Sequence, residues 1–270
     1  MVAEFQNALS SAARVFQLLD AENESDDSAL PALQISNGAV EFQNIDFAYT
    51  QKKPLIRNFS LSVNPGQTVA IVGASDSGKS ALAELAARLY DPDEGQICVD
   101  GLELREYAFE TLYNKLSYVP QRAALFSGSV RSNVFFGESE IIHREEDLKA
   151  VLMEIPGEIL PERVDESGET LSDGQRQRLG IARALARRPE ILILNDCFEG
   201  LDIPTCKGLL EGLDQTTVLL ITQQTGLARM ADHIVVLEQG KLVGQGTHDQ
   251  LVKDCPAYRA LLPDGQEAEP

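Results

Sequence analysis

Residues 73–80 have the types and the spacing that bind a chain of phosphates. They are Gly73, Ala74, Ser75, Asp76, Ser77, Gly78, Lys79 and Ser80, which satisfies the pattern G-x-x-x-x-G-K-[ST]. The pattern lies between a predicted buried strand at 68–72 and a predicted helix at 79–90, where backbone N–H groups cradle phosphate oxygens. We expect Lys79 to contact the β- and γ-phosphates and Ser80 to offer its hydroxyl to Mg²⁺.

Asp76 is an unusual residue for such a loop. Its carboxylate repels a bound polyanion unless the side chain points outward. We therefore expect Asp76 to lower the affinity for nucleotide.

A second motif opens a predicted helix over 175–187 and consists of Leu171, Ser172, Asp173, Gly174 and Gln175. Together with the phosphate loop and the Walker B-like segment 191–196, this signature motif resembles the nucleotide-binding domain of ABC transporters. The resemblance spans residues 39 to about 262, with the motifs in the family's order. It implies an α/β fold: a P-loop NTPase (RecA-like) core with a mainly parallel sheet, an N-terminal antiparallel β region and an inserted helical lobe at about 122–180.

The resemblance also implies cofactors and partners. In the family, two such domains sandwich two ATP molecules with Mg²⁺, each between one domain's phosphate loop and the other domain's signature motif. One chain then forms half of each site. The implied partners are a second nucleotide-binding domain and a transmembrane domain.

Three further positions acquire roles from the resemblance. Tyr49 stands where the family stacks an aromatic ring on adenine, although it could be an ordinary strand tyrosine. Gln121 stands at the Q-loop, which senses Mg²⁺ and the γ-phosphate and touches the membrane domain; the alternative is a solvated loop glutamine. Gln223 falls at the switch histidine, where an amide can donate to phosphate but carries no titratable charge; the alternative is a surface amide after a strand.

The residues that would hold the metal and activate water are Asn195 and Asp196. Asp196 might take the magnesium position, but counting back from Leu201-Asp202 as in the family assigns that position to Asn195, with Ser80 and Gln121 as the other metal contacts. An amide oxygen at Asn195 supplies no charge. Successive strand residues face opposite ways, so we do not expect Asp196 to substitute for its neighbour. Asp196 is also one methylene shorter than the family's catalytic glutamate, which makes it a poor base by geometry.

Residues 195–198 with Gln223, and the segments 247–248 and 255–259, look like the degenerate-site half of heterodimeric bacterial ABC exporters. This closer resemblance implies an ATP-binding domain with an impaired site of its own and a more competent heterodimeric partner. The chain departs from that pattern at Asp173, which replaces a glycine, and at Glu199 and Gly200. Two alternatives stay open: an active homodimeric ABC ATPase, and a soluble ABC-type regulatory or scaffold protein.

The elements that position these residues follow from periodicity. Residues 1–20 place Phe5, Leu9, Phe16 and Leu19 on one helical face that resembles the connector after an exporter's last transmembrane helix. We expect an acidic linker at 21–38, the nucleotide-binding domain at 39–262 and an acidic tail at 263–270. Strands at 116–119, 191–195, 217–221 and 233–237 alternate with helices at 129–136, 145–154 and 205–213, which predicts a largely parallel sheet covered on both faces.

Composition limits the function. The net charge of −19 over 270 residues disfavours binding to nucleic acid or anionic lipid. The apolar runs are shorter than the ~20 residues that cross a bilayer, and the N-terminus lacks a signal layout. The four cysteines are scattered, which favours buried thiols over a disulfide framework or metal site. From composition we expect a soluble, cytosolic chain; the resemblance implies a place at the cytoplasmic side of the cell membrane, attached through a transmembrane domain.

Overall fold

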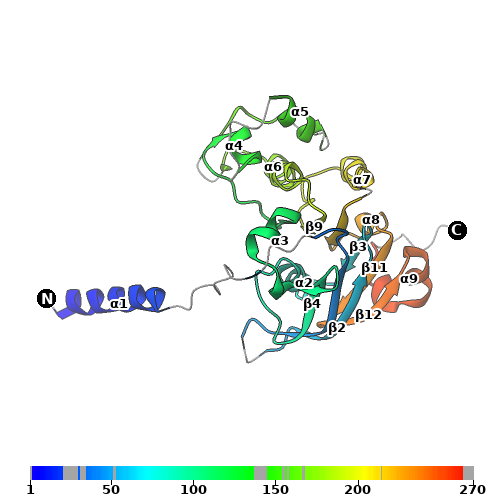
Figure 1. The fold of residues 1–270 in the computed structure, drawn as a ribbon, viewed down its shortest axis with the longest axis horizontal. Coiled ribbons are helices and arrows are strands. Elements are labelled where there is room, and N and C mark those ends of the chain that lie inside the picture. Colours follow the sequence, from blue (N-terminus) through cyan, green and yellow to red (C-terminus); the bar gives the residue numbers. More distant parts are fainter. Residues whose placement is uncertain are drawn as a thin grey trace.

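The computed structural model describes most of the chain (Figure 1). The described residues are 2–20, 30, 35–50, 53–136, 145–153, 155, 157, 159–165, 168–213 and 215–263. Most of the expected linker at 21–38, and all but the first residue of the expected tail at 263–270, lie outside these ranges.

The central element is a six-stranded sheet with the order β12-β11-β3-β10-β9-β6. Its strands are β12 (Lys241–Gly246), β11 (His233–Glu238), β3 (Thr68–Val72), β10 (Thr217–Ile221), β9 (Ile191–Asn195) and β6 (Leu116–Val119). All neighbours pair in parallel except the edge strand β12, which is antiparallel to β11. The predicted mainly parallel sheet is confirmed.

Alternate residues of the central strands enter two separate cores. Along β9, Ile191 and Ile193 face one hydrophobic cluster, while Leu192 and Leu194 face the other. Because both faces are covered, these strands are apolar throughout instead of alternating with polar residues. That burial explains why short apolar runs located them in the sequence.

One core is closed by a second, antiparallel sheet, as the resemblance implied. Its order is β2-β1-β4-β5, with β1 (Val40–Phe47), β2 (Ile56–Val63), β4 (Glu94–Val99) and β5 (Leu102–Glu103). The 3₁₀ turn η1 (Leu104–Glu106) and helix α3 (Phe109–Lys115) lead from it to β6. Inward residues of this sheet and of α2 (Lys79–Ala86) form the cluster with Val69 and Ile71 of β3.

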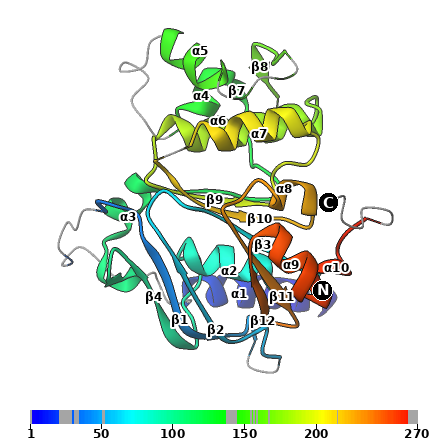
Figure 2. The ribbon, with the colours of Figure 1, turned by 90° about the vertical axis from the view of Figure 1, so that its right-hand side faces the viewer.

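A helical lobe lies beyond the β9 and β6 edge of the central sheet (Figure 2). Its apolar residues belong to the core on the other face of that sheet. Its described elements are β7 (Gly128–Ser129), α4 (Val130–Val134), α5 (Glu145–Met153), β8 (Arg163–Val164) and α6 (Asp173–Ala186). Ser129 caps α4, accepting from the Ser132 backbone, and Arg183 of α6 donates to the Asn133 carbonyl at 2.8 Å. The inserted lobe, which lies between Gln121 and the signature motif, is thus fixed to helix α6.

The remaining helices are α7 (Ile203–Glu211), α8 (Thr225–Ala228), α9 (His248–Asp254) and α10 (Pro256–Arg259). Several predicted helix boundaries are wrong, and two of them have clear local reasons. The helix expected over 79–90 ends at Ala86, because Arg88 takes a left-handed φ of 52°. The helix expected from Thr205 begins at Ile203, because the Asp202 carboxylate caps it by accepting from the Thr205 N–H at 2.8 Å.

The predicted N-terminal helix is α1 (Val2–Leu19), which lies to one side of the other elements in Figure 1. Leu9, Phe16 and Leu19 are exposed. Among the described residues, no helix has the length and apolarity needed to span a bilayer.

Candidate nucleotide site

The phosphate loop connects β3 to α2, as the sequence predicted. A Cβ added at Gly73 would lie 2.2 Å from the Leu237 carbonyl oxygen, so only glycine fits there. Gly78 has a φ of 102° and an added Cβ would lie 2.6 Å from the Ile56 side chain. The two glycines therefore let the loop curl closely over the ends of β3 and β11.

Lys79 is the first residue of α2, and its side chain reaches back to the start of the loop. Its Nζ donates to the carbonyls of Gly73 at 2.9 Å and Ala74 at 2.8 Å, and the residue is 4% exposed. Burial lowers the pKa of Lys79, while the nearby carboxylates of Asp196 and Asp76 act against that shift. A cation enclosed by a glycine-lined loop at a helix N-terminus fits a phosphate chain.

Asp76 lies at the tip of the loop and is exposed. Its backbone has a left-handed φ of 60°, which aspartate tolerates better than most residues, although glycine adopts it without a steric penalty. The aspartate at position 76 therefore affects both the charge and the backbone conformation of the loop.

The expected metal position has a hydroxyl and an amide. Ser80 Oγ donates to Asn195 Oδ1 at 3.3 Å, and Asn195 Nδ2 donates to the Tyr118 hydroxyl at 3.0 Å. Asn195 is 5% exposed, so its amide is fixed at the end of β9 by these two contacts. Oxygen ligands for Mg²⁺ are present, but this pair supplies no negative charge.

Asp196 lies one residue beyond β9, and this changes part of the sequence argument. The alternation of side chains along a strand does not apply to it, because its φ is 46° and the strand ends at Asn195. The turn directs Asp196 into the same cavity as Lys79, where its Oδ1 accepts from the Gln223 N–H at 3.2 Å. Burial raises the pKa of Asp196, and the Lys79 charge and the Gln223 hydrogen bond oppose this rise.

A cavity of about 620 Å³ brings most of the predicted residues together. Tyr49, Gln121, Asp196 and Gln223 line it with residues 75–80 of the phosphate loop. Gln223 also contacts the loop directly, since Ser75 Oγ donates to its Oε1 at 3.2 Å. The amide at the expected switch position therefore already touches the loop.

The signature motif does not line this cavity. Ser172 and Gln175 form a reciprocal cap, with Gln175 N donating to Ser172 Oγ at 3.1 Å and Ser172 N donating to Gln175 Oε1 at 3.0 Å. Asp173, the first residue of α6, is exposed. The motif presents a helix N-terminus at the surface, apart from the chain's own phosphate loop.

Sequence reasoning missed three side chains around the cavity. Glu84 on α2 accepts a hydrogen bond from the Tyr49 hydroxyl, and Tyr90 packs against the Tyr49 ring with centroids 5.2 Å apart. Tyr118, the third, fixes Asn195. No motif marks these residues, because each acts through a contact between segments that are far apart in the sequence. Only Tyr118 could have been noticed, since it lies just before Val119-Pro120-Gln121 at the expected Q-loop.

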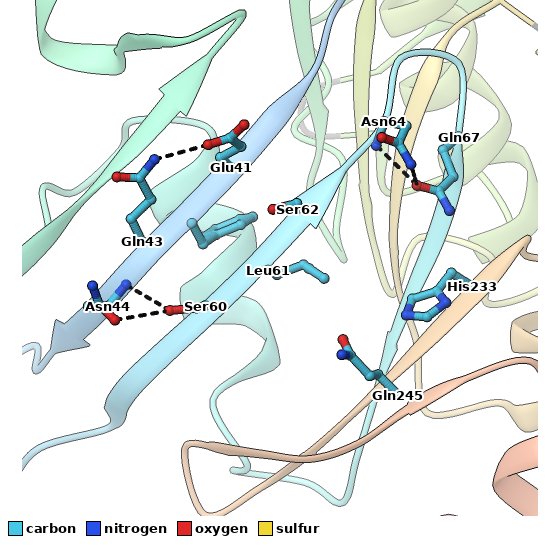
Figure 3. A pocket seen from close by; sticks show the side chains of 11 residues that line it. Glu41, Gln43, Asn44, Ser60, Leu61, Ser62, Asn64, Gln67, His233 and Gln245 are labelled. Atoms are coloured by element: carbon cyan, nitrogen blue, oxygen red, sulfur yellow. Dashed lines mark hydrogen bonds between the residues drawn. The ribbon is translucent and has the colours of Figure 1, made fainter.

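A second hollow, of about 750 Å³, lies over β1 and β2 near His233 of β11 and Gln245 of β12 (Figure 3). Its lining is mostly amide and hydroxyl side chains, including Gln43, Asn64 and Gln67. It shares no lining residue with the phosphate-loop cavity.

Among the described residues, no cluster of three histidine, cysteine or acidic side chains could hold a metal ion.

Comparisons with known proteins agree with this geometry. Residues 56–199 match the model of a family described as ABC transporter. The ATP-dependent lipid A-core flippases of Escherichia coli (strain K12) and Shigella flexneri are 36% identical, over 96% of this chain and 46% of theirs. A bacterial Atm1-family ABC exporter solved with ATP bound is 31% identical, with a TM-score of 0.83 over 95% of this chain and 47% of that one.

The chain thus spans just under half the length of these relatives. The family match contains the phosphate loop, the signature motif and the strand that ends at Asn195. With the sheet order and the phosphate-loop geometry, these matches show that the chain belongs to the ABC transporter family and has that family's ATPase-domain fold.

Proposed function

We propose that this chain is the nucleotide-binding domain of an ABC exporter and that its own site binds ATP but hydrolyses it poorly. The observation that carries the proposal is the contact between Ser80 and Asn195 at 3.3 Å. An uncharged amide occupies the position opposite the metal-binding hydroxyl, where the resemblance places a carboxylate. Mg²⁺, when bound, neutralises charge on the transferring phosphate, and a site with fewer anionic ligands holds it less firmly.

ATP binding is supported by the parts of the site that match the family's pattern. The glycine-lined loop, the enclosed Lys79 ammonium and the half-exposed Tyr49 ring line one cavity. Phosphates would be held by the loop and by Lys79, and the base by stacking on Tyr49. Ser80, Gln121 and Asn195 are the residues that would contact the metal.

Weak hydrolysis is further supported by the two remaining positions. The Asp196 carboxylate accepts the backbone N–H of Gln223 and lies near the Lys79 charge, so it is engaged in local contacts. Gln223 has no titratable group with which to respond to charge on the γ-phosphate. One observation favours the rival function of an active homodimeric ATPase: Asp196 does lie inside the cavity.

The partner proposals follow from the signature motif. Residues 171–175 lie outside the chain's own cavity and Asp173 at the start of α6 is exposed, which is compatible with this helix N-terminus facing the site of a second nucleotide-binding domain. We propose a heterodimer with a more competent domain, at the cytoplasmic side of a membrane and attached to a transmembrane domain. The flippases and the exporter named above, of which this chain spans just under half, support attachment to a transmembrane domain. The heterodimer rests on the residue types at Asn195, Asp196 and Gln223 alone.

Repair of the three degenerate positions tests the function. The purified chain should bind ATP, measured as a rise in unfolding temperature with ATP concentration, and turn over far below the ~10 per second of a typical enzyme. Asn195→Asp, Asp196→Glu and Gln223→His act on one step, so the triple variant should gain more turnover than the three single variants combined. Additive single gains would show that these residues do not work as a unit.

Two outcomes would overturn the proposal itself. Turnover near a typical enzyme's rate in the unmodified chain would support the active homodimer. No saturable ATP binding would support the scaffold protein. A Lys79→Ala variant is the control, because it removes the phosphate-binding cation and should abolish binding.

A further inference from the structure

The Tyr49 ring is held by three contacts at the edge of the phosphate-loop cavity. It lies in the connection after β1 and is 48% exposed. Phe47 and Tyr90 pack against it edge-on, with ring centroids 5.0 Å and 5.2 Å away. The Tyr49 hydroxyl donates a hydrogen bond to the Glu84 carboxylate.

Glu84 belongs to α2, the helix whose first two residues are Lys79 and Ser80. Its side chain is partly buried beside the aromatic group. One short helix therefore carries the phosphate-binding residues at its beginning and a carboxylate that holds the Tyr49 ring further along. The position of the ring is thereby coupled to that of the phosphate loop.

The Glu84 contact adds to the two ring contacts that restrict the Tyr49 side chain. Residues 48–50 have no regular secondary structure, so these side-chain contacts contribute to the orientation of the ring. A hydrogen bond to an ionised acceptor is stronger than one between neutral groups. Burial, followed by the hydrogen bond and the charge of Glu84, raises the pKa of Tyr49, so the phenol remains a donor at physiological pH.

We propose that Glu84 is a positioning residue for the nucleotide base, because it holds the Tyr49 ring preorganised for stacking at the edge of the cavity. This inference rests on the proposed ATP site. Preorganising one side chain saves part of the ordering cost of binding, and that saving corresponds to roughly 3- to 10-fold in affinity.

The experiment separates the base from the phosphates. ATP and inorganic tripolyphosphate are titrated into the full chain, and the ratio of their dissociation constants measures the contribution of the nucleoside. Glu84→Ala should reduce affinity for ATP by roughly 3- to 10-fold and leave affinity for tripolyphosphate unchanged. Glu84→Gln retains an acceptor oxygen and should fall between the wild type and Glu84→Ala.

Tyr49→Phe supplies the second arm. It keeps the ring but removes the hydroxyl, so its loss should equal that of Glu84→Ala, and the double variant should lose no more than either. Glu110→Ala is the matched control, since it removes an exposed surface carboxylate from α3. It should leave the ratio unchanged.

The outcomes distinguish this inference from the proposed function. An unmodified chain that binds neither ligand contradicts the ATP site and the inference together. ATP binding with a ratio that Glu84→Ala does not change contradicts the inference alone. Losses from Glu84→Ala and Tyr49→Phe that add in the double variant also contradict it, because the two groups would then act separately.

Discussion

Asn195 contacts two hydroxyl groups, and this arrangement accommodates either an amide or a carboxylate. Its Nδ2 donates to Tyr118 and its Oδ1 accepts from Ser80. With aspartate at the position, the Tyr118 hydroxyl can rotate to donate, so no buried group loses its partner. The missing charge at the proposed metal position is thus separable from the local packing, which is why the repair variants are expected to fold.

Asp76 offers the clearest prediction at the scale of one residue. Asp76→Gly removes a carboxylate beside the phosphate site and relieves the left-handed φ of 60°. We expect ATP affinity to rise by roughly 2- to 5-fold, more at low ionic strength. The free energy of unfolding should rise by up to about 1 kcal/mol.

A second variant separates the two effects at position 76. Asp76→Asn removes the charge but keeps a side chain that tolerates the left-handed region. It should gain affinity without the gain in stability. Titrations at two salt concentrations and thermal unfolding measure the two effects, and an equal stability gain in both variants would contradict the backbone argument.

The site residues divide by how the sequence encodes them. Lys79 and Ser80 could be predicted because a contiguous motif fixes their geometry locally. Gln223 and Asn195 required the family's spacing, because only folding brings the ends of β9 and β10 beside the loop. Glu84 could not be predicted, since its role depends on a contact with Tyr49 that no local pattern encodes.

Among the elements, the turn between β4 and β5 anchors the start of the domain. The Asp100 carboxylate accepts from the backbone N–H groups of Ser36, Asn37 and Ala39. Burial alone would raise the pKa of Asp100, but these hydrogen bonds lower it below its ordinary value. The carboxylate therefore stabilises the fold above the unfolded-state pKa of about 4, and that stabilisation is lost as pH falls through the lower folded-state pKa.

Asp100→Asn should accordingly cost roughly 1 kcal/mol at neutral pH. The difference in unfolding free energy between the two proteins should shrink as pH falls below about 4. Denaturant unfolding across pH measures it, with Asp91→Asn as a control at an exposed position. A difference that stays constant with pH would show that the Asp100 charge is not involved.

The start of α6 and the segment after β9 meet through two glycines. A Cβ at Gly200, whose φ is 80°, would lie 2.8 Å from the Gly174 nitrogen. Gly200→Ala should therefore lower the free energy of unfolding by about 1–2 kcal/mol. Gly208, inside α7 with nothing within 4 Å of an added Cβ, is the matched control; Gly208→Ala should instead stabilise the protein by about 1 kcal/mol.

Urea unfolding of the two variants compares a constrained glycine with an unconstrained one. Similar effects of the two substitutions would contradict the close approach of the segments.

The strands differed in how well the sequence predicted them. The bounds of β3, β6, β9 and β10 match the apolar runs, whereas β2 and β12 alternate buried and more exposed residues and were missed.

At the scale of the whole molecule, the net acidic charge and the exposed residues Ser172 and Asp173 of the signature motif bear on the proposed association with a second domain. The net charge is −19, and Asp173 and Glu199 are both exposed beside the Gly174–Gly200 contact. Like charges on one surface repel a second acidic surface and any phosphate brought to it. In the proposed heterodimer, a partner with fewer acidic residues at its own nucleotide site would meet less repulsion than a second copy of this chain.

Asp173 permits a direct test of the shared site. A helix N-terminus attracts anions through its free N–H groups and its dipole, so a carboxylate on the first residue of α6 competes with phosphate. Because Asp173 does not line the chain's own cavity, Asp173→Gly should leave the ATP affinity of the isolated chain unchanged. In the assembly it should tighten ATP-dependent dimerisation by roughly 2- to 5-fold, with the larger effect at low salt.

The measurement compares monomer ATP affinity with complex formation and turnover, for both proteins, at two ionic strengths. Glu169→Gln is the control, because it neutralises an exposed carboxylate shortly before the signature motif without altering α6. If Asp173→Gly changes the monomer and leaves the complex unaffected, Asp173 does not face a partner's nucleotide. The proposal that one chain completes the site of another would then be wrong, whatever the turnover of the isolated domain.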